Sequence, residues 1–201
     1  MTRVKLNRFK AEKPTDELLE KYLRVIDSKD MYFRMESLPL LTSETLFGND
    51  HPMMFDLGCR RGDFVVSQAR ENPDMNFVGF DLHWKSLWDA INKTTALGLE
   101  NVRYLRADLR RSMELVPDAS LSEITMLFPT PVVKQNRLKR DPLPAETADH
   151  ILRVLAPGSS FHFVTDHTEY FAVKTALLDD LDGFERVSDS RRFEGGITWF
   201  Q

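Results

Sequence analysis

The stretch FDLGCRRGDF, residues 55–64, decides the fold that we expect for this chain of 201 residues. Its first half is a short apolar run that ends in an acid and a glycine, and its second half begins like a helix. Gly58 and Gly62 permit a tight turn with close backbone approach to a ligand. The helix that follows would offer free amide donors at its start. The stretch therefore predicts a nucleotide-type cradle, although Arg60 stands where a middle glycine is usual.

The rest of the chain repeats the alternation of strand and helix. Short apolar runs at 53–58, 76–81, 102–108, 123–128 and 160–166 predict strands, and longer periodic segments separate most of them. This order predicts an α/β fold with a doubly wound, mostly parallel sheet and right-handed crossovers. The tail segments GFERVSD and GITWFQ, at 183–189 and 196–201, predict a pair of antiparallel edge strands.

Two parts of unequal size are expected. Residues 1–50 would form a basic N-terminal arm and a packing helix, and residues 51–201 would form one domain. Thr15 or Asp16 is the expected N-cap of the packing helix. Its apolar face would carry Leu18, Leu19, Tyr22, Leu23 and Ile26.

Composition narrows the class of protein. Hydrophobic residues make up 42% and charged residues 29% of the chain, which is typical of a soluble globular protein. The net charge of −4 provides no overall basic field, so any nucleic-acid contact would need a local patch. Cys59 is the only cysteine, which excludes an internal disulfide and a cysteine-built metal site and favours a reducing cytosol. Since the start of the chain lacks a signal-like apolar core, we expect a cytoplasmic protein without metal or membrane partner.

Acids end four of the five predicted strands, namely Asp56, Asp81, Asp108 and Asp166. Ligands of doubly wound sheets bind beyond the carboxyl ends of the strands. Asp81 follows Gly58 by 81 − 58 = 23 positions, close to the offset of about 20 at which an acid meets ribose hydroxyls. A pyrophosphate fits poorly because Asp56 would repel it. An adenosyl ligand that carries an amino acid fits better, with its ammonium near the first turn and its exocyclic amine near Asp108.

The runs DLGCRRGDF, NFVGFD, NVRYLRAD, LFPTP and VLAPGSSFHFVTD resemble class I S-adenosylmethionine-dependent methyltransferases. They are most similar to the tRNA (guanine-N7) methyltransferase family, over residues 54–201. The resemblance implies a Rossmann-like methyltransferase fold, S-adenosylmethionine as cofactor and S-adenosylhomocysteine as product. The cofactor-binding residues that it implies are Asp56, Gly58, Cys59, Arg60, Gly62, Asp81, Leu82, Asp108, Leu109 and Phe128.

The resemblance also implies a substrate side. Catalytic roles fall on Thr130 and Asp166. Substrate-binding roles fall on Pro129, Lys134, Arg137, Asp166, Thr198 and Gln201. Two departures stand out. The family's FPDPW reads FPTPV here, so that Thr130 replaces an acid, and the family's TxxE ends in Gln201.

Loss of two acids beside the acceptor predicts a changed substrate. We expect N-methylation of a planar nitrogen heterocycle or a related small molecule, by in-line transfer without a general base. The first alternative is a tRNA (guanine-N7) methyltransferase, which the basic run KQNRLKR at 134–140 and Asp166 favour. The second is a non-catalytic, regulatory protein that binds S-adenosylmethionine. Either a monomer or a homodimer is compatible with the sequence.

Overall fold

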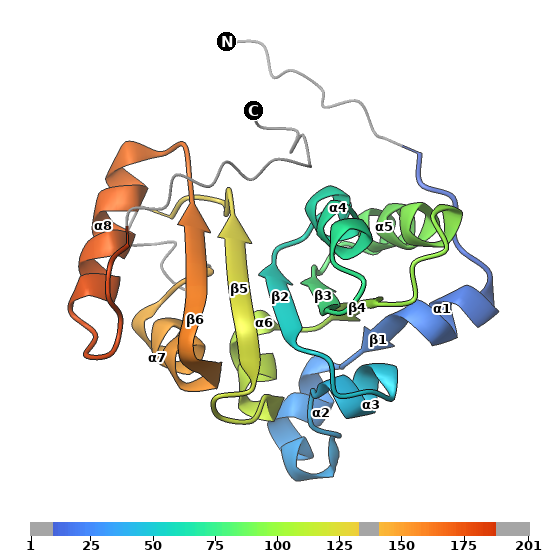
Figure 1. Cartoon of the computed structure of the whole chain (residues 1–201), viewed down its shortest axis with the longest axis horizontal. Coiled ribbons are helices and arrows are strands. Elements are labelled where there is room, and N and C mark those ends of the chain that lie inside the picture. The colour runs from blue at the N-terminus through green and yellow to red at the C-terminus, as the bar shows by residue number, and fades with distance from the viewer. Residues whose placement is uncertain (1–9, 133–140, 188–201) are drawn as a thin grey trace.

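Six parallel strands form one sheet in the order β1-β4-β3-β2-β5-β6 (Figure 1). The computed structural model describes residues 10–132 and 141–187. The strands are β1 Leu23–Val25, β2 Met53–Leu57, β3 Asn76–Phe80, β4 Val102–Arg106, β5 Leu121–Leu127 and β6 Leu155–Val164. The chain order reverses between β2 and β5, which are neighbours in the sheet. This confirms the predicted parallel, doubly wound α/β architecture.

Helices cover both faces of the sheet (Figure 1). They are α1 Asp16–Tyr22, α2 Ser28–Phe33, α3 Ser43–Phe47, α4 Asp63–Glu71, α5 Trp84–Ala96, α6 Leu109–Ser112, α7 Ala145–Val154 and α8 Thr168–Asp179, with short 3₁₀ turns η1 Met35–Ser37 and η2 Met113–Leu115. In the described ranges, no helix combines the length and the apolar character needed to cross a membrane.

Each central strand divides its side chains between two cores. Phe55 and Leu57 of β2 pack into one core with residues of α7 and η2, while Met54 packs into the other with residues of α4 and α5. All five positions of β2 are buried, as are all five of β3. Strands covered on both faces read as continuous apolar runs, which is why the sequence reveals them.

The expected packing helix is shorter than its apolar pattern suggests. It begins after the N-cap Thr15, as predicted, but it ends at Tyr22. Residues 23–25 instead form β1, which pairs in parallel with β4 at the edge of the sheet. The open edge of β4 supplies backbone hydrogen-bond partners, such as the bond from Ile26 N to Arg106 O of 3.1 Å. Tertiary pairing thus overrides a local helical pattern.

The predicted antiparallel strand pair at the C-terminus is not present in the described residues. Every strand pairing in that part of the chain is parallel, and residues 184–187 form no strand. Phe184 instead lies 6.4 Å from Phe161 of β6, centroid to centroid, and packs against the core on one face of the sheet. This packing places the segment over a sheet face. The second expected strand, at 196–201, lies outside the described residues.

Candidate active site

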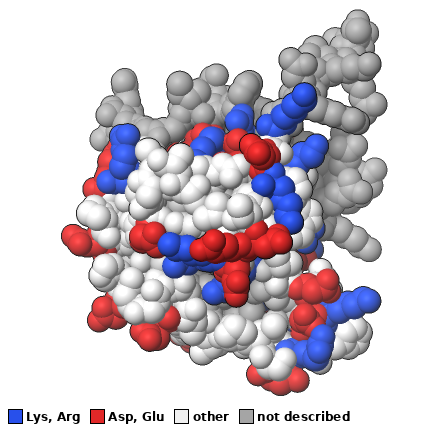
Figure 2. Space-filling model, turned by 90° about the vertical axis from the view of Figure 1, so that its right-hand side faces the viewer, with Lys and Arg blue, Asp and Glu red and all other residues white. Residues whose placement is uncertain are grey.

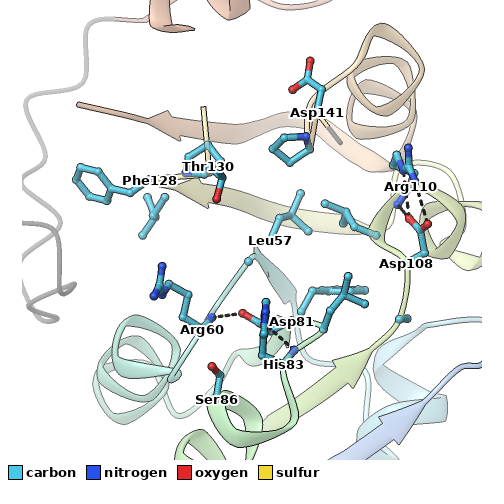
Figure 3. Close-up of a pocket in the computed structure, with 18 residues that line it drawn as sticks. Leu57, Arg60, Asp81, His83, Ser86, Asp108, Arg110, Phe128, Thr130 and Asp141 are labelled. Carbon is cyan, nitrogen blue, oxygen red and sulfur yellow. Dashed lines mark hydrogen bonds and ion pairs between the residues drawn. The ribbon is translucent and has the colours of Figure 1, made fainter. Parts of the chain in front are cut away.

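A cavity of about 640 Å³ lies beyond the carboxyl ends of β2, β3, β4 and β5 (Figure 3). This is the point at which the chain order of the sheet reverses, where ligands of such folds bind. Its lining includes Leu57, Gly58, Arg60, Phe80, Asp81, Leu82, His83, Ser86, Ala107, Asp108, Leu109, Arg110, Leu127, Phe128, Pro129, Thr130, Asp141 and Pro142. Most of the residues expected at the cofactor therefore share one cavity.

The turn after β2 keeps the conformation of a glycine cradle although it contains an arginine. Gly58, Arg60 and Gly62 all have positive φ angles, of 92°, 49° and 70°. The amides of Gly58 and Cys59 both donate to Phe80 O, at 2.9 and 2.8 Å. A left-handed backbone costs a residue other than glycine about 1–2 kcal/mol. The turn has therefore not relaxed to accommodate Arg60.

The two glycines of the cradle serve different purposes. A Cβ atom added at Gly58 would meet nothing within 4 Å, so that this position leaves open space beside the cavity. A Cβ atom at Gly62 would lie 2.7 Å from Ala90 Cβ and 2.8 Å from Tyr104 Oη. Gly58 thus provides room for a ligand, whereas Gly62 allows α4 to pack closely on α5 and does not line the cavity.

Asp81 is held in one orientation at the end of β3. Its Oδ2 accepts from Arg60 N at 3.0 Å, and its Oδ1 accepts from His83 N at 2.7 Å. The Nδ1 atom of His83 lies 3.1 Å from the same Oδ1. These contacts fix a carboxylate at the mouth of the turn, with lone pairs left for hydroxyl donors of a ligand.

Asp108 marks the opposite end of the cavity from Phe128 and Thr130 (Figure 3). It caps α6 by accepting from Arg110 N at 3.1 Å, and Arg110 Nη2 lies 3.1 Å from its Oδ2. The hydrogen bond to Asp108 raises the pKa of the Arg110 guanidinium. The sequence did not single out Arg110, which both lines the cavity and orients the acid expected at adenine.

Asp56 lies beneath the turn and not in the lining of the cavity. Its side chain is buried and accepts from Thr125 Oγ1 at 2.7 Å. Burial raises the pKa of Asp56 to about 7, and the negative charge of Asp81 acts in the same direction. This environment gives no support to the expected contact between Asp56 and an ammonium group. A direct role for Asp56 at the cofactor stays a prediction.

Cys59 is also buried beneath the turn and does not line the cavity. Burial raises the pKa of its thiol, so the thiolate needed for nucleophilic attack is not favoured. Its Sγ atom would lie 2.7 Å from a Cβ atom added at Gly79, which shows how tightly this region is packed. The position fits a small buried filler, and a contact with cofactor stays a prediction.

Residues at the end of β5 and directly after it form the wall of the cavity that includes Phe128, Pro129 and Thr130. Phe128 has a φ angle of 49° and donates its backbone N–H to Val164 O at 2.7 Å. Pro129 and Thr130 follow it in the lining, and the Thr130 hydroxyl points into the cavity (Figure 3). Strained backbone on both sides of one cavity end, at Arg60 and Phe128, is typical of functional sites.

A buried ion pair that the sequence did not reveal lies behind this wall. Asp141 of the lining pairs with Lys174 of α8, and both side chains are buried. Asp141 also accepts from Tyr170 Oη at 2.8 Å and from Leu143 N at 3.2 Å. Lys174 donates further to Leu143 O at 2.7 Å. The network attaches the cavity wall to α8.

The remaining substrate-side residues do not join the site in the described structure. Asp166 is exposed on a bend after β6 and does not line the cavity. Lys134, Arg137, Thr198 and Gln201 lie outside the described residues. The roles expected for all five stay predictions.

Taken as a ligand site, the cavity fits S-adenosylmethionine. There is open space beside Gly58, and Asp81 and Asp108 both line the cavity. The contacts of Asp81 with ribose and of Asp108 with adenine stay predictions. Fold and cavity together define a class I S-adenosylmethionine-dependent methyltransferase. A solved methyltransferase described as antibiotic-related shares this fold, with a TM-score of 0.50 and 21% identity over 68% of this chain and 71% of that chain.

The family follows from sequence comparison. The chain belongs to the family described as "Putative methyltransferase", whose model matches residues 50–199. It is 35% identical to a tRNA (guanine-N(7)-)-methyltransferase of Rubrobacter xylanophilus over 89% of this chain and 80% of the relative. It is 32% identical to the protein of that name from Chloroherpeton thalassium, over 92% of this chain and 82% of the relative. The protein is thus an enzyme that transfers methyl groups from S-adenosylmethionine, as predicted.

Proposed function

We propose that this enzyme methylates N7 of a guanine in tRNA. The observation that carries the proposal is the extended similarity to proteins named for this reaction, at 35% and 32% identity over most of both chains. This favours the first alternative from the sequence over the small-molecule acceptor that we expected. Membership of a methyltransferase family also speaks against a purely regulatory protein.

Methyl transfer to N7 requires the protein mainly to orient the cofactor and the acceptor base. S-adenosylmethionine, when bound, supplies a methyl group whose bond to sulfur breaks as the N7 lone pair of guanine forms the new bond. N7 carries no proton, so no general base is required, and positioning accounts for most of the rate. In this account Asp81 and Asp108 orient the cofactor. The Thr130 hydroxyl offers the acceptor base one hydrogen bond without a negative charge.

Contacts to tRNA phosphates require a local basic surface, because the chain has a net charge of −4. On the face drawn in Figure 2, acidic and basic side chains alternate and form no single basic area among the described residues. Several of the described basic residues are paired, as Lys21 is with Glu100 at 2.8 Å. We therefore assign the phosphate contacts to the basic run at 134–140, which directly follows the wall of the cavity in sequence.

Thr130 supports a second candidate function. The replacement of an acid beside the acceptor removes a group that would hold guanine N–H donors and stabilise a cationic product. A planar nitrogen heterocycle without such N–H donors has no hydrogen bonds to this acid, so the replacement would weaken its binding less than that of guanine. Methyl transfer to such a small molecule is therefore the competing proposal.

The test follows a labelled methyl group from S-adenosylmethionine into tRNA, with digestion to nucleosides and identification of the product by mass spectrometry. We expect 7-methylguanosine. We also expect Thr130→Asp to raise kcat/KM for tRNA by about tenfold, since a hydrogen bond to a charged group contributes roughly 1.5–3 kcal/mol. Thr130→Val is the matched control and should lower it. Label in a heterocycle and none in tRNA would instead support the second candidate.

A further inference from the structure

Four charged residues tie the turn after β2 to helix α5. Arg61 lies in the turn itself and Asp63 is the first residue of α4, while Asp89 and Lys93 lie one turn apart on α5. None of the four lines the cavity. Two positive and two negative charges cancel, so the group adds little net field to the cavity. It can influence a ligand there through the backbone that it holds.

Lys93 holds the main chain of the turn. Its Nζ atom donates to the carbonyl oxygen of Arg61 at 3.1 Å, and it pairs with Asp63 and, at 3.0 Å, with Asp89. The three donors of a lysine ammonium match these three acceptors. Asp89 also accepts from Arg61 Nε at 2.6 Å. Arg61 is therefore attached to α5 twice, through its carbonyl oxygen and through its side chain.

The surroundings of this group keep it charged. The side chains of Arg61 and Asp89 are partly buried, so the pair is screened less by salt than a pair on an open surface. The hydrogen bond with Asp89 raises the pKa of the Arg61 guanidinium. Burial acts to raise the pKa of Asp89, but hydrogen bonds from Arg61 and Lys93 outweigh burial, and the pKa is lowered.

The contacts of Lys93 fall beside the strained residue of the turn. Arg60 directly precedes Arg61 and has a φ angle of 49°, in the left-handed region. Strained backbone persists only where the surrounding structure fixes it. On the cavity side, Arg60 N donates to Asp81 Oδ2 at 3.0 Å. On the side of α5, the next carbonyl oxygen accepts from Lys93. The backbone around Arg60 is thus held from two sides.

We propose that Lys93 is a positioning residue for the cofactor. By binding the carbonyl oxygen of Arg61, it keeps Arg60 in the left-handed conformation that directs Arg60 N to Asp81 and leaves the space beside Gly58 open. Lys93 acts through this backbone and touches no ligand. This role requires that the cavity is the cofactor site, and it does not depend on which molecule accepts the methyl group.

Calorimetric titration with S-adenosylhomocysteine tests this role. The proteins are the wild type, Lys93→Met, Lys93→Arg, Arg60→Gly and the double variant that combines Arg60→Gly with Lys93→Met. Glycine adopts a left-handed backbone without strain, so the double variant should not need the contact. Any effect of losing the arginine side chain is present in both Arg60→Gly proteins and cancels between them. Lys21→Met, which breaks an exposed ion pair with Glu100, is the matched control. Thermal unfolding gives the stability of each variant.

Lys93→Met is expected to bind S-adenosylhomocysteine about tenfold more weakly than the wild type, because the apparent affinity falls with the fraction of molecules whose turn has the binding conformation. In the Arg60→Gly background, the same substitution should weaken binding by no more than about twofold. Lys93→Arg should bind within about threefold of the wild type, since arginine keeps the positive charge and several N–H donors. The control should bind as the wild type does.

A purely structural role of Lys93 leads to a different result. Lys93→Met would then lower the melting temperature and leave the affinity of the folded protein unchanged, which would overturn the proposal. An equal loss of affinity in both backgrounds would also overturn it, because the strain at Arg60 would have no part in the effect. If the wild type does not bind S-adenosylhomocysteine, the cavity is not the cofactor site and the proposal fails. Failure of the proposed function would be seen separately, in the labelled-methyl assay with tRNA.

Discussion

Lys174→Met is expected to lower the free energy of unfolding by about 3–5 kcal/mol, because it leaves the buried carboxylate of Asp141 without its countercharge. Both members of the pair are buried, with 6% and 5% of their side chains exposed. Tyr170 Oη and Leu143 N still donate to Asp141, but neutral donors do not replace a charge. Urea denaturation at pH 7 measures the loss.

Two further variants test the origin of this loss. Asp141→Asn combined with Lys174→Met should recover much of the stability, because the amide oxygen still accepts hydrogen bonds and no lone charge remains buried. Lys21→Met removes one member of an exposed ion pair with Glu100 and should have little effect. If Lys174→Met costs no more than Lys21→Met, the pair does not stabilise the cavity wall as described.

Gly62→Ala is expected to cost about 2–4 kcal/mol of stability. A left-handed backbone disfavours alanine by roughly 1 kcal/mol, and overpacking of a dense core adds about 1–3 kcal/mol. At a φ angle of 70°, the new methyl group would lie 2.7 Å from Ala90 Cβ and 2.8 Å from Tyr104 Oη. Either α4 moves away from α5 or the side chains shift. Thermal and chemical unfolding curves measure the effect.

Gly48→Ala is the matched control for Gly62. Gly48 has a similar φ angle, of 74°, and a Cβ atom there would meet nothing within 4 Å. This substitution should lower the free energy of unfolding only by the cost of a left-handed backbone for alanine, about 1 kcal/mol. The difference between the two variants isolates the steric effect of close packing between α4 and α5. Equal losses would mean that Gly62 is required for its conformation alone.

Local sequence patterns predicted the parallel sheet and much of the cavity. The central strands β2 and β3 are buried at every position and mostly apolar because both of their faces are covered, and each is followed by a turn or cap residue. Gly58, Asp81 and Asp108 follow three of these strands, and in a parallel sheet the carboxyl ends meet at one edge. The positions of these residues at the carboxyl ends of their strands were thus enough to predict that they lie close together in space.

Features that depend on distant partners could not be predicted in this way. Strand β1 lies in a segment with a helical apolar pattern, and only the open edge of β4 makes it a strand. Asp141 follows a basic run, and its partners Tyr170 and Lys174 lie 29 and 33 positions further along the chain. Asp56 was expected at a strand end like the other acids, yet it lies within β2 and hydrogen-bonds to Thr125 of the neighbouring strand instead of lining the cavity.

The prediction of a small-molecule acceptor was based on too few residues of the sequence. It depended chiefly on Thr130 and Gln201, where the chain lacks acids that the resembling family carries. Similarity to tRNA (guanine-N(7)-)-methyltransferases extends over 89% and 92% of the chain. An acceptor nitrogen that already has a free lone pair tolerates the loss of orienting acids better than a reaction that needs a base. Changes at these two positions are therefore compatible with an unchanged substrate class.

Calorimetric titration with S-adenosylhomocysteine, on the wild type and on Asp81→Asn, tests most directly whether the cavity at the strand ends is the cofactor site. The wild type should bind one equivalent in the micromolar range. Asp81→Asn should bind about tenfold more weakly, because the amide offers one acceptor atom where the carboxylate offers two. Asp74→Asn, at an exposed position outside the cavity, should bind as the wild type does. No binding by the wild type, or equal binding by all three proteins, would contradict the account.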